Sequence, residues 1–209
     1  MVKQVYKIST VIVLALTFSI SCAKQGQLYE DSNGYGSSSE YSCKFVDYQA
    51  LETEVVLTEV PFISQAKNNC GYASLEMVLR SKGESIDQYE LADNSEAVLK
   101  NGVSAEQILV KAQELGFINS SIASCGLNNM LELIQQGFPV IARVYNKDFT
   151  AGHFVVVTGF NKDSEILYVN DPEVGNTDTI EISFSDFQAL WDVNTLGKNN
   201  SNFLMIIVK

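Results

Sequence analysis

The chain has 209 residues, 46% of them hydrophobic, and carries a formal net charge of −11 at pH 7. This length allows one domain of moderate size with a buried core, plus extra segments. The acidic balance argues against nucleic acid as a partner, because its phosphates would be repelled. With one histidine and four cysteines, none of them in a CxxC pair, we expect no metal site and no cofactor.

Residues 1–21 have the organisation of a secretory signal. Lys3 and Lys7 give a short basic start, and an apolar run over residues 8–20 is too short for a comfortable membrane span. A serine followed by Cys22 resembles the end of a bacterial lipoprotein signal, in which the cysteine is lipidated and becomes the new N-terminus. We therefore expect export and attachment to a membrane of the cell envelope, on its periplasmic or outer surface. Simple secretory cleavage nearby, with Cys22 incidental, is the alternative.

Residues 22–52 are predicted to be a flexible tether. Glycine, serine and acidic residues are frequent between residues 23 and 42, and no apolar periodicity is present there. Residues 53–209 carry the apolar patterns of a folded domain. The chain is thus expected to consist of a signal, a tether and one domain.

The domain is predicted to begin with a strand over residues 55–63, ended or placed at a sheet edge by Pro61. A helix follows from Cys70 through Arg80, with Gly83 as its stop signal. The remaining elements are helices capped by Ser85 or Asp87 and by Ser104, helices over 127–136 and 183–191, and strands over 117–122, 139–145, 154–160, 166–169 and 203–208. Helices come first and antiparallel strands follow, so the predicted fold class is α+β.

Cys70 is placed at or just before the N-terminus of its helix. There the helix dipole and the free backbone N–H groups favour a thiolate over a thiol. Gln65 lies on the loop leading into that helix, and its amide can donate a hydrogen bond to an oxygen anion that forms beside the sulfur. Taken alone, each residue is more often ordinary: a buried cysteine and a surface amide.

His153 and Asp171 give the cysteine a possible base. His153 begins a strand that is apolar at nearly every position, and Asp171 follows the next strand. If the two strands form a hairpin, the start of the first and the end of the second are neighbours. A carboxylate orients an imidazole, and an imidazole takes a proton from a cysteine. Taken alone, a histidine at the start of a strand is usually a polar cap, and an Asp-Pro pair is usually a turn. Together, the four residues indicate a nucleophile (Cys70), a base (His153), an orienting carboxylate (Asp171) and an oxyanion donor (Gln65).

The chain resembles the family-39 cysteine peptidases at Gln65, Cys70–Ser74, Gly152–Val157 and Val169–Pro172. These include double-glycine leader peptidases that process bacteriocin precursors, and related stand-alone domains. The resemblance, over residues 55–209, implies a papain-like fold with an N-terminal helical subdomain packed on a C-terminal antiparallel sheet. It also implies a peptide or protein substrate, hydrolysed through a thioester by Cys70, His153 and Asp171, in a protein that we expect to be a monomer.

Two other activities fit the same order of cysteine, histidine and aspartate. One is an acyltransferase or transglutaminase-type thiol enzyme on a related fold. The other is a domain that has lost catalysis and only binds peptides, although the intact triad argues against it. Loops around the site carry no readable specificity, so the sequence leaves the substrate open.

Elimination predicts one disulfide. If Cys22 is lipidated and Cys70 is catalytic, Cys43 and Cys125 are the two cysteines left in an oxidising compartment. We therefore expect a bond between them after export.

Overall fold

The computed structural model describes residues 41–93, 101–145, 152–173, 178–191 and 204–209, all of them within one unit of the chain, Ser37–Lys209. The expected signal and Cys22 lie outside the described residues. Within the described ranges, no helix is both long and apolar enough to cross a membrane.

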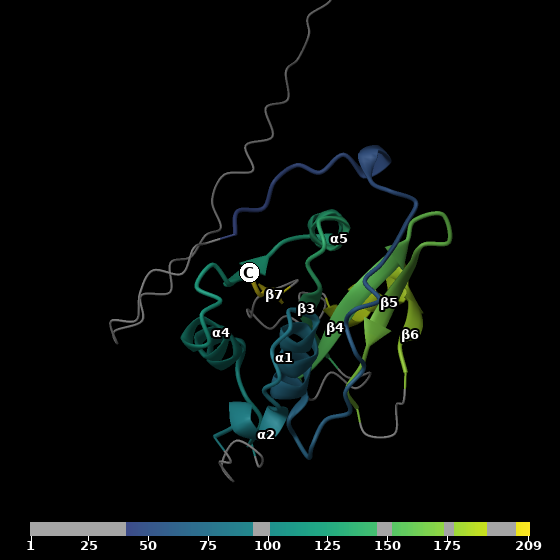
Figure 1. The fold of residues 1–209 in the computed structure, drawn as a ribbon. Helices are drawn as coiled ribbons and strands as arrows, with labels where there is room; N and C mark the ends of the chain where they lie inside the picture. The colour runs from purple at the N-terminus through teal and green to yellow at the C-terminus, as the bar shows by residue number, and fades with distance from the viewer. Residues whose placement is uncertain (1–40, 94–100, 146–151, 174–177, 192–203) are drawn as a thin grey trace, which may run out of the picture. The chain divides into compact units, whose positions relative to one another are not determined.

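The described helices and strands form an α+β domain (Figure 1). The helices are α1 Cys70–Ser81, α2 Gln88–Leu91, α4 Ala105–Glu114, α5 Leu127–Gln135 and α6 Phe184–Trp191, with a 3-10 helix η1 at Tyr48–Ala50. The strands are β1 Glu54–Val56, β2 Ser121–Ser124, β3 Val140–Tyr145, β4 Gly152–Asn161, β5 Ile166–Asn170, β6 Ile180–Ser183 and β7 Leu204–Ile207. They form one sheet in the order β2-β7-β3-β4-β5-β6, antiparallel throughout, and β1 also pairs with β4. The predicted fold class is confirmed.

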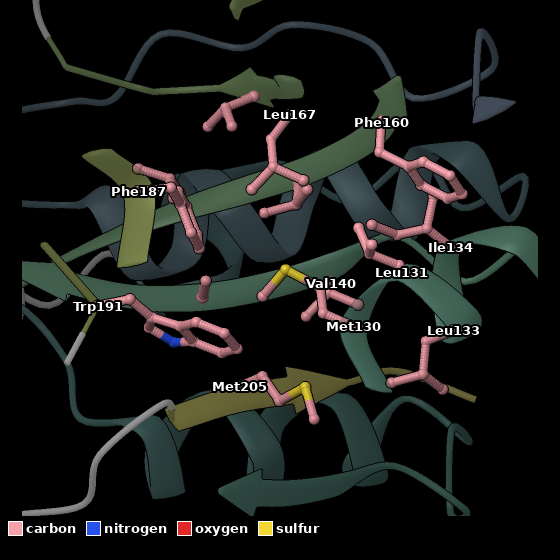
Figure 2. Close-up of a cluster of buried hydrophobic side chains, with 14 of the residues drawn as sticks. Met130, Leu131, Leu133, Ile134, Val140, Phe160, Leu167, Phe187, Trp191 and Met205 are labelled. Atoms are coloured by element: carbon pink, nitrogen blue, oxygen red, sulfur yellow. The ribbon is translucent and has the colours of Figure 1, made fainter. Parts of the chain in front are cut away.

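Each face of the sheet buries its own hydrophobic cluster. Phe154 and Val156 of β4 pack with side chains of α1, α2 and α4, whereas Val155 and Val157 pack with those of α5 and α6. Figure 2 shows the second cluster, where side chains of α5 and α6 meet those of the strands. A bulge between Val157 and Gly159 reverses the alternation, so Phe160 joins the α5 and α6 cluster. β4 is therefore buried on both faces, as its sequence predicts.

Helix α1 is fixed against β4 close to its first turn. The buried Ser74 hydroxyl donates to the Phe154 carbonyl over 3.2 Å. The helix ends as expected before Gly83, whose φ of +89° lies in the left-handed region. The N-terminus of α1 therefore lies beside the first residues of β4.

The caps of the next two helices are those predicted. Asp87 caps α2 in a capping box with Glu90, and Ser104 caps α4 in a capping box with Gln107. Helices α5 and α6 and strands β3, β4, β5 and β7 lie within two residues of their expected bounds.

Two predicted strands need correction, and one strand of the sheet was not predicted. The strand expected over residues 55–63 ends at Val56, because a turn follows in which Val60 N–H donates to Leu57 over 3.3 Å. The strand expected over 117–122 starts only at Ser121, after another turn. Strand β6 was not predicted, since it is a four-residue edge strand whose first two residues are exposed, and it lacks a long apolar alternation.

The end of the predicted tether is part of the domain. Cys43 and Cys125 form the expected disulfide, with their Cα atoms 5.4 Å apart, and Leu51 is buried in the α5 and α6 cluster. Lys44 also forms an ion pair with Glu132 of α5 at 2.9 Å. Residues 41–52 therefore belong to the domain, and the boundary at residue 52 is too late in the chain.

Candidate active site

The Cys70 sulfur lies at the N-terminus of α1 and is not part of a disulfide. It accepts hydrogen bonds from the backbone N–H groups of Gly71 and Phe154 and is hydrogen-bonded to the His153 side chain. Burial raises the pKa of the thiol, but the hydrogen bonds and the charge of His153 together lower it by more. The pKa of Cys70 is therefore below its ordinary value. The environment favours a thiolate.

His153 lies between Cys70 and Asp171. Its Nε2 is 2.6 Å from Asp171 Oδ1, and both side chains are mostly buried, with 17% and 23% of their surfaces exposed. The hairpin explains this contact, because β4 pairs with β5 up to Val156 opposite Asn170, and the two residues extend from that end. With Nε2 facing Asp171, Nδ1 is the ring nitrogen left for the Cys70 sulfur. The expected neighbourhood of His153 and Asp171 is thus found.

The charges in this row stabilise one another. Burial lowers the pKa of His153, but hydrogen bonds to Asp171 and Cys70 and the negative charges of both raise it, to about 10. For Asp171, burial raises the pKa, while the hydrogen bonds from His153 and from the Glu173 N–H lower it below its ordinary value. His153 therefore favours the ionised forms of Cys70 and Asp171, and the two negative charges favour the protonated form of His153.

Gln65 reaches the site through its backbone. Its N–H donates to the Pro172 carbonyl over 2.8 Å, which joins the loop before α1 to the loop that follows β5. Its side-chain Oε1 is buried and has no hydrogen-bond partner among the residues that the structure describes. The structure therefore brings Cys70, His153 and Asp171 into a hydrogen-bonded row, and the Gln65 Oε1 has no partner in the described part of the chain.

Asn170 supports the site, and this role was not predicted from the sequence. This fully buried amide donates to the carbonyls of Val60 and Pro61, at 3.4 and 3.3 Å, and accepts from the Thr179 hydroxyl over 2.6 Å. It thereby fixes the strand end from which Asp171 projects. Its place directly before Asp171 was a signal that could have drawn attention to it.

Glu173 supplies a second carboxylate near the base. Its Oε2 lies 4.0 Å from His153 Nε2, and 59% of its side chain is exposed. No pattern in the sequence pointed to it. Within the described ranges, no group of three or more histidine, cysteine, aspartate or glutamate side chains could hold a metal ion.

The model of the "Peptidase_C39 like family" matches residues 57–197, two thirds of the chain. This chain belongs to that family. No curated protein sequence matches it at a significant level. The match includes all four residues predicted for the site.

Solved structures agree with this fold. The chain is similar to the peptidase domain of Streptococcus ComA, a bi-functional ABC transporter involved in a quorum sensing pathway, with 21% identity, 70% of this chain and 96% of that chain covered, and a TM-score of 0.54. The chain is also similar to a double glycine motif protease from an AMS/PCAT transporter in complex with the leader peptide, with 21% identity, 76% of this chain and 100% of that chain covered, and a TM-score of 0.49. A third similar structure is xylellain, a cysteine protease from Xylella fastidiosa, with 10% identity, 79% of this chain and 90% of that chain covered, and a TM-score of 0.48. The family and the ComA domain confirm the papain-like cysteine peptidase fold.

Proposed function

We propose that this domain is a cysteine peptidase that hydrolyses peptide bonds of a peptide or protein substrate through Cys70, His153 and Asp171. The observation that carries the proposal is the position of His153, with Nε2 at 2.6 Å from Asp171 and a hydrogen bond to the sulfur at a helix N-terminus. Membership of the family and the papain-like fold support it.

In the first half of the reaction, the Cys70 thiolate attacks the carbonyl carbon of the scissile peptide bond. The oxygen becomes an anion, which accepts hydrogen bonds from the Cys70 backbone N–H and from the Gln65 side-chain amide. His153, protonated at the start, gives its Nδ1 proton to the leaving amine. The C–N bond breaks and the acyl group remains on the sulfur as a thioester.

In the second half, His153 takes a proton from a water molecule that attacks the thioester. The same two donors meet the second oxyanion, the acid leaves, and the proton on His153 restores the imidazolium beside the thiolate. Asp171 accepts from Nε2–H throughout, so the ring keeps Nδ1 directed toward the sulfur. Asp171 itself does not need to change protonation state.

The cell envelope is the proposed location, through lipidation of Cys22. The Cys43–Cys125 disulfide supports export, because such bonds persist in oxidising compartments. Mass spectrometry of the N-terminal peptide from the native host would test this part. A diacylated Cys22 is expected, and an unmodified N-terminus elsewhere would contradict it.

Thiol labelling tests whether Cys70 is activated. Iodoacetamide at limiting concentration, followed by peptide mass mapping, should modify Cys70 much faster than free cysteine at pH 6, and His153→Ala should remove that advantage. A domain that only binds peptides predicts equally slow labelling in both proteins. If Cys70 is labelled rapidly, and the unlabelled protein passes acyl groups to an added amine but releases no acid in water, the protein is an acyltransferase.

A further inference from the structure

Gln88, the first residue of α2, holds the loop that carries Gln65. This loop, Ser64–Asn69, is called the oxyanion loop below. The Gln88 side chain donates from Nε2 to the Ser64 carbonyl over 3.0 Å and accepts at Oε1 from the Ala66 N–H over 2.6 Å. These two contacts hold the backbone on both sides of Gln65. Gln88 is only 6% exposed, so the hydrogen bonds are largely shielded from water.

The same residue also holds the end of the oxyanion loop. Asn69, directly before Cys70 and fully buried, donates from Nδ2 to the Gln88 carbonyl over 3.1 Å and to Gln88 Oε1 over 3.4 Å. The Asn69 N–H closes the loop by donating to the Ala66 carbonyl over 3.0 Å. One side chain thus connects the oxyanion donor with the start of the helix that carries the nucleophile.

Gln88 is in turn held by α1. Its backbone N–H donates to Oε2 of Glu76 over 2.9 Å, and Glu76 is 4% exposed. The other oxygen of Glu76 pairs with Arg80 at 2.8 Å on the same helix. The oxyanion loop is therefore positioned relative to α1 and not only by the chain connection at Cys70.

This support matters because Gln65 has little of its own. Its Oε1 has no hydrogen-bond partner among the described residues, and its backbone N–H donates to the Pro172 carbonyl. A donor to an oxyanion acts only when it is already in place, and a shift of about 1 Å can cost about 10²-fold in rate. Resting on the proposed function, we infer that Gln88 is the positioning residue that places Gln65 for oxyanion stabilisation.

Two reagents separate this role from activation of the thiol. p-Nitrophenyl acetate acylates Cys70 through a tetrahedral oxyanion and releases p-nitrophenolate. Iodoacetamide alkylates the same sulfur by displacing iodide and forms no oxyanion. Gln88→Met keeps the volume and removes the side-chain hydrogen bonds, so acylation should slow by about 10-fold to 10²-fold while alkylation stays within about twofold. The Cys70→Ala protein gives the background for both rates.

A double-variant cycle identifies the partner. Gln65→Ala alone should slow acylation by the order of 10²–10³, as for loss of one oxyanion donor. Gln88→Met added to Gln65→Ala should slow it little further, because Gln88 acts through Gln65. Fully additive losses would overturn the inference.

Asn129→Leu is the matched control. Asn129 is also 6% exposed, and its amide likewise holds a backbone segment, accepting from Lys44 N–H over 3.3 Å and donating to the Lys44 carbonyl over 2.8 Å, on the α5 helix. It should lower the midpoint of thermal unfolding without changing either rate. If Gln88→Met does not fold, Gln88→Glu is the second variant, which keeps an acceptor for Ala66 N–H and loses the donor to Ser64. It should lower the acylation rate by a smaller factor and leave the alkylation rate unchanged.

The outcomes are distinguishable. Unchanged acylation in folded Gln88 variants, or acylation and alkylation falling together, overturns the role of Gln88 and leaves the proposed function intact. If the alkylation rate of Cys70 in the wild type is no higher than that of free cysteine, the proposed function is wrong, and the inference about Gln88 is wrong with it.

Discussion

His153 Nε2 lies 2.6 Å from Asp171 Oδ1, although the two residues are 18 positions apart in the sequence. The β4–β5 hairpin brings them together, so the base and its orienting carboxylate belong to one local unit. Cys70 comes from a different element, α1. The site is therefore completed when α1 docks on β4, a contact that Ser74 fixes one turn after Cys70.

The rate of Cys70 alkylation should remain high at pH values below the ordinary pKa of a thiol. The pKa of Cys70 lies below its ordinary value and that of His153 is raised to about 10, so the thiolate persists below the ordinary thiol pKa. The rate falls only when the pH drops through the lowered pKa of Cys70. Stopped-flow alkylation between pH 4 and pH 10 measures this profile.

His153→Ala is the control for that profile. Removing the imidazolium removes two of the causes that lower the Cys70 pKa, so the midpoint should move to higher pH. Coincident midpoints in the two proteins would mean that His153 does not stabilise the thiolate.

Gly71→Ala should disturb the site through packing. A Cβ at Gly71 would overlap Val103 Cγ2 and lie 2.9 Å from Ile108 Cδ1. Such overpacking costs about 1–3 kcal/mol and should also shift Cys70, so both the free energy of unfolding and the alkylation rate should fall. Urea unfolding and iodoacetamide kinetics measure the two effects.

Val103→Ala tests the cause. Combined with Gly71→Ala, it removes the nearest clashing group, and the pair should recover part of both losses. A pair that is worse by the sum of the two single effects would place the damage elsewhere than at this contact.

Most of the candidate site could be predicted because its residues lie at element ends with strong local signals. A continuous apolar strand and a polar turn identify the hairpin of His153 and Asp171, and an apolar stripe ended by Gly83 identifies the helix of Cys70. Gln88 could not be found in this way. It begins a four-residue helix, and its contacts to Ser64 and Ala66 depend on how α2 packs.

The bounds of the domain were less predictable for a related reason. The composition of residues 41–52 resembles that of a tether, and only tertiary contacts of Cys43 and Leu51 hold the segment on the domain. In the same way, the apolar run after Val56 does not pair as a strand because a turn at Leu57–Val60 takes its backbone away from the sheet. Local patterns do not encode such contacts.

Replacing both Cys43 and Cys125 by serine should lower stability and spare the chemistry. The disulfide spans 82 positions and packs with the α5 and α6 cluster, on the other face of the sheet from α1. Closing a loop of that length is worth about 4 kcal/mol in the chain-entropy account. Urea unfolding should register the loss, while iodoacetamide labelling of Cys70 under native conditions should keep its rate. A large fall in that rate would link the disulfide to the site.

Asp171→Asn and Gln65→Ala should give graded losses of peptidase turnover. Asparagine at 171 removes the charge that stabilises the imidazolium, so the loss should be less than or about equal to that of His153→Ala. Gln65→Ala should lower kcat by the order of 10²–10³, since one oxyanion donor is lost. Circular dichroism should show both proteins folded, because neither side chain lies in the core. A Gln65→Ala protein with wild-type kcat would remove Gln65 from the mechanism.

The most direct test of the account is peptide cleavage by the wild type and Cys70→Ala, purified side by side and incubated with a diverse peptide mixture whose products are identified by mass spectrometry. New peptide termini are expected with the wild type and nearly none with Cys70→Ala, while both proteins unfold at similar temperatures. Equal cleavage by the two proteins would contradict it.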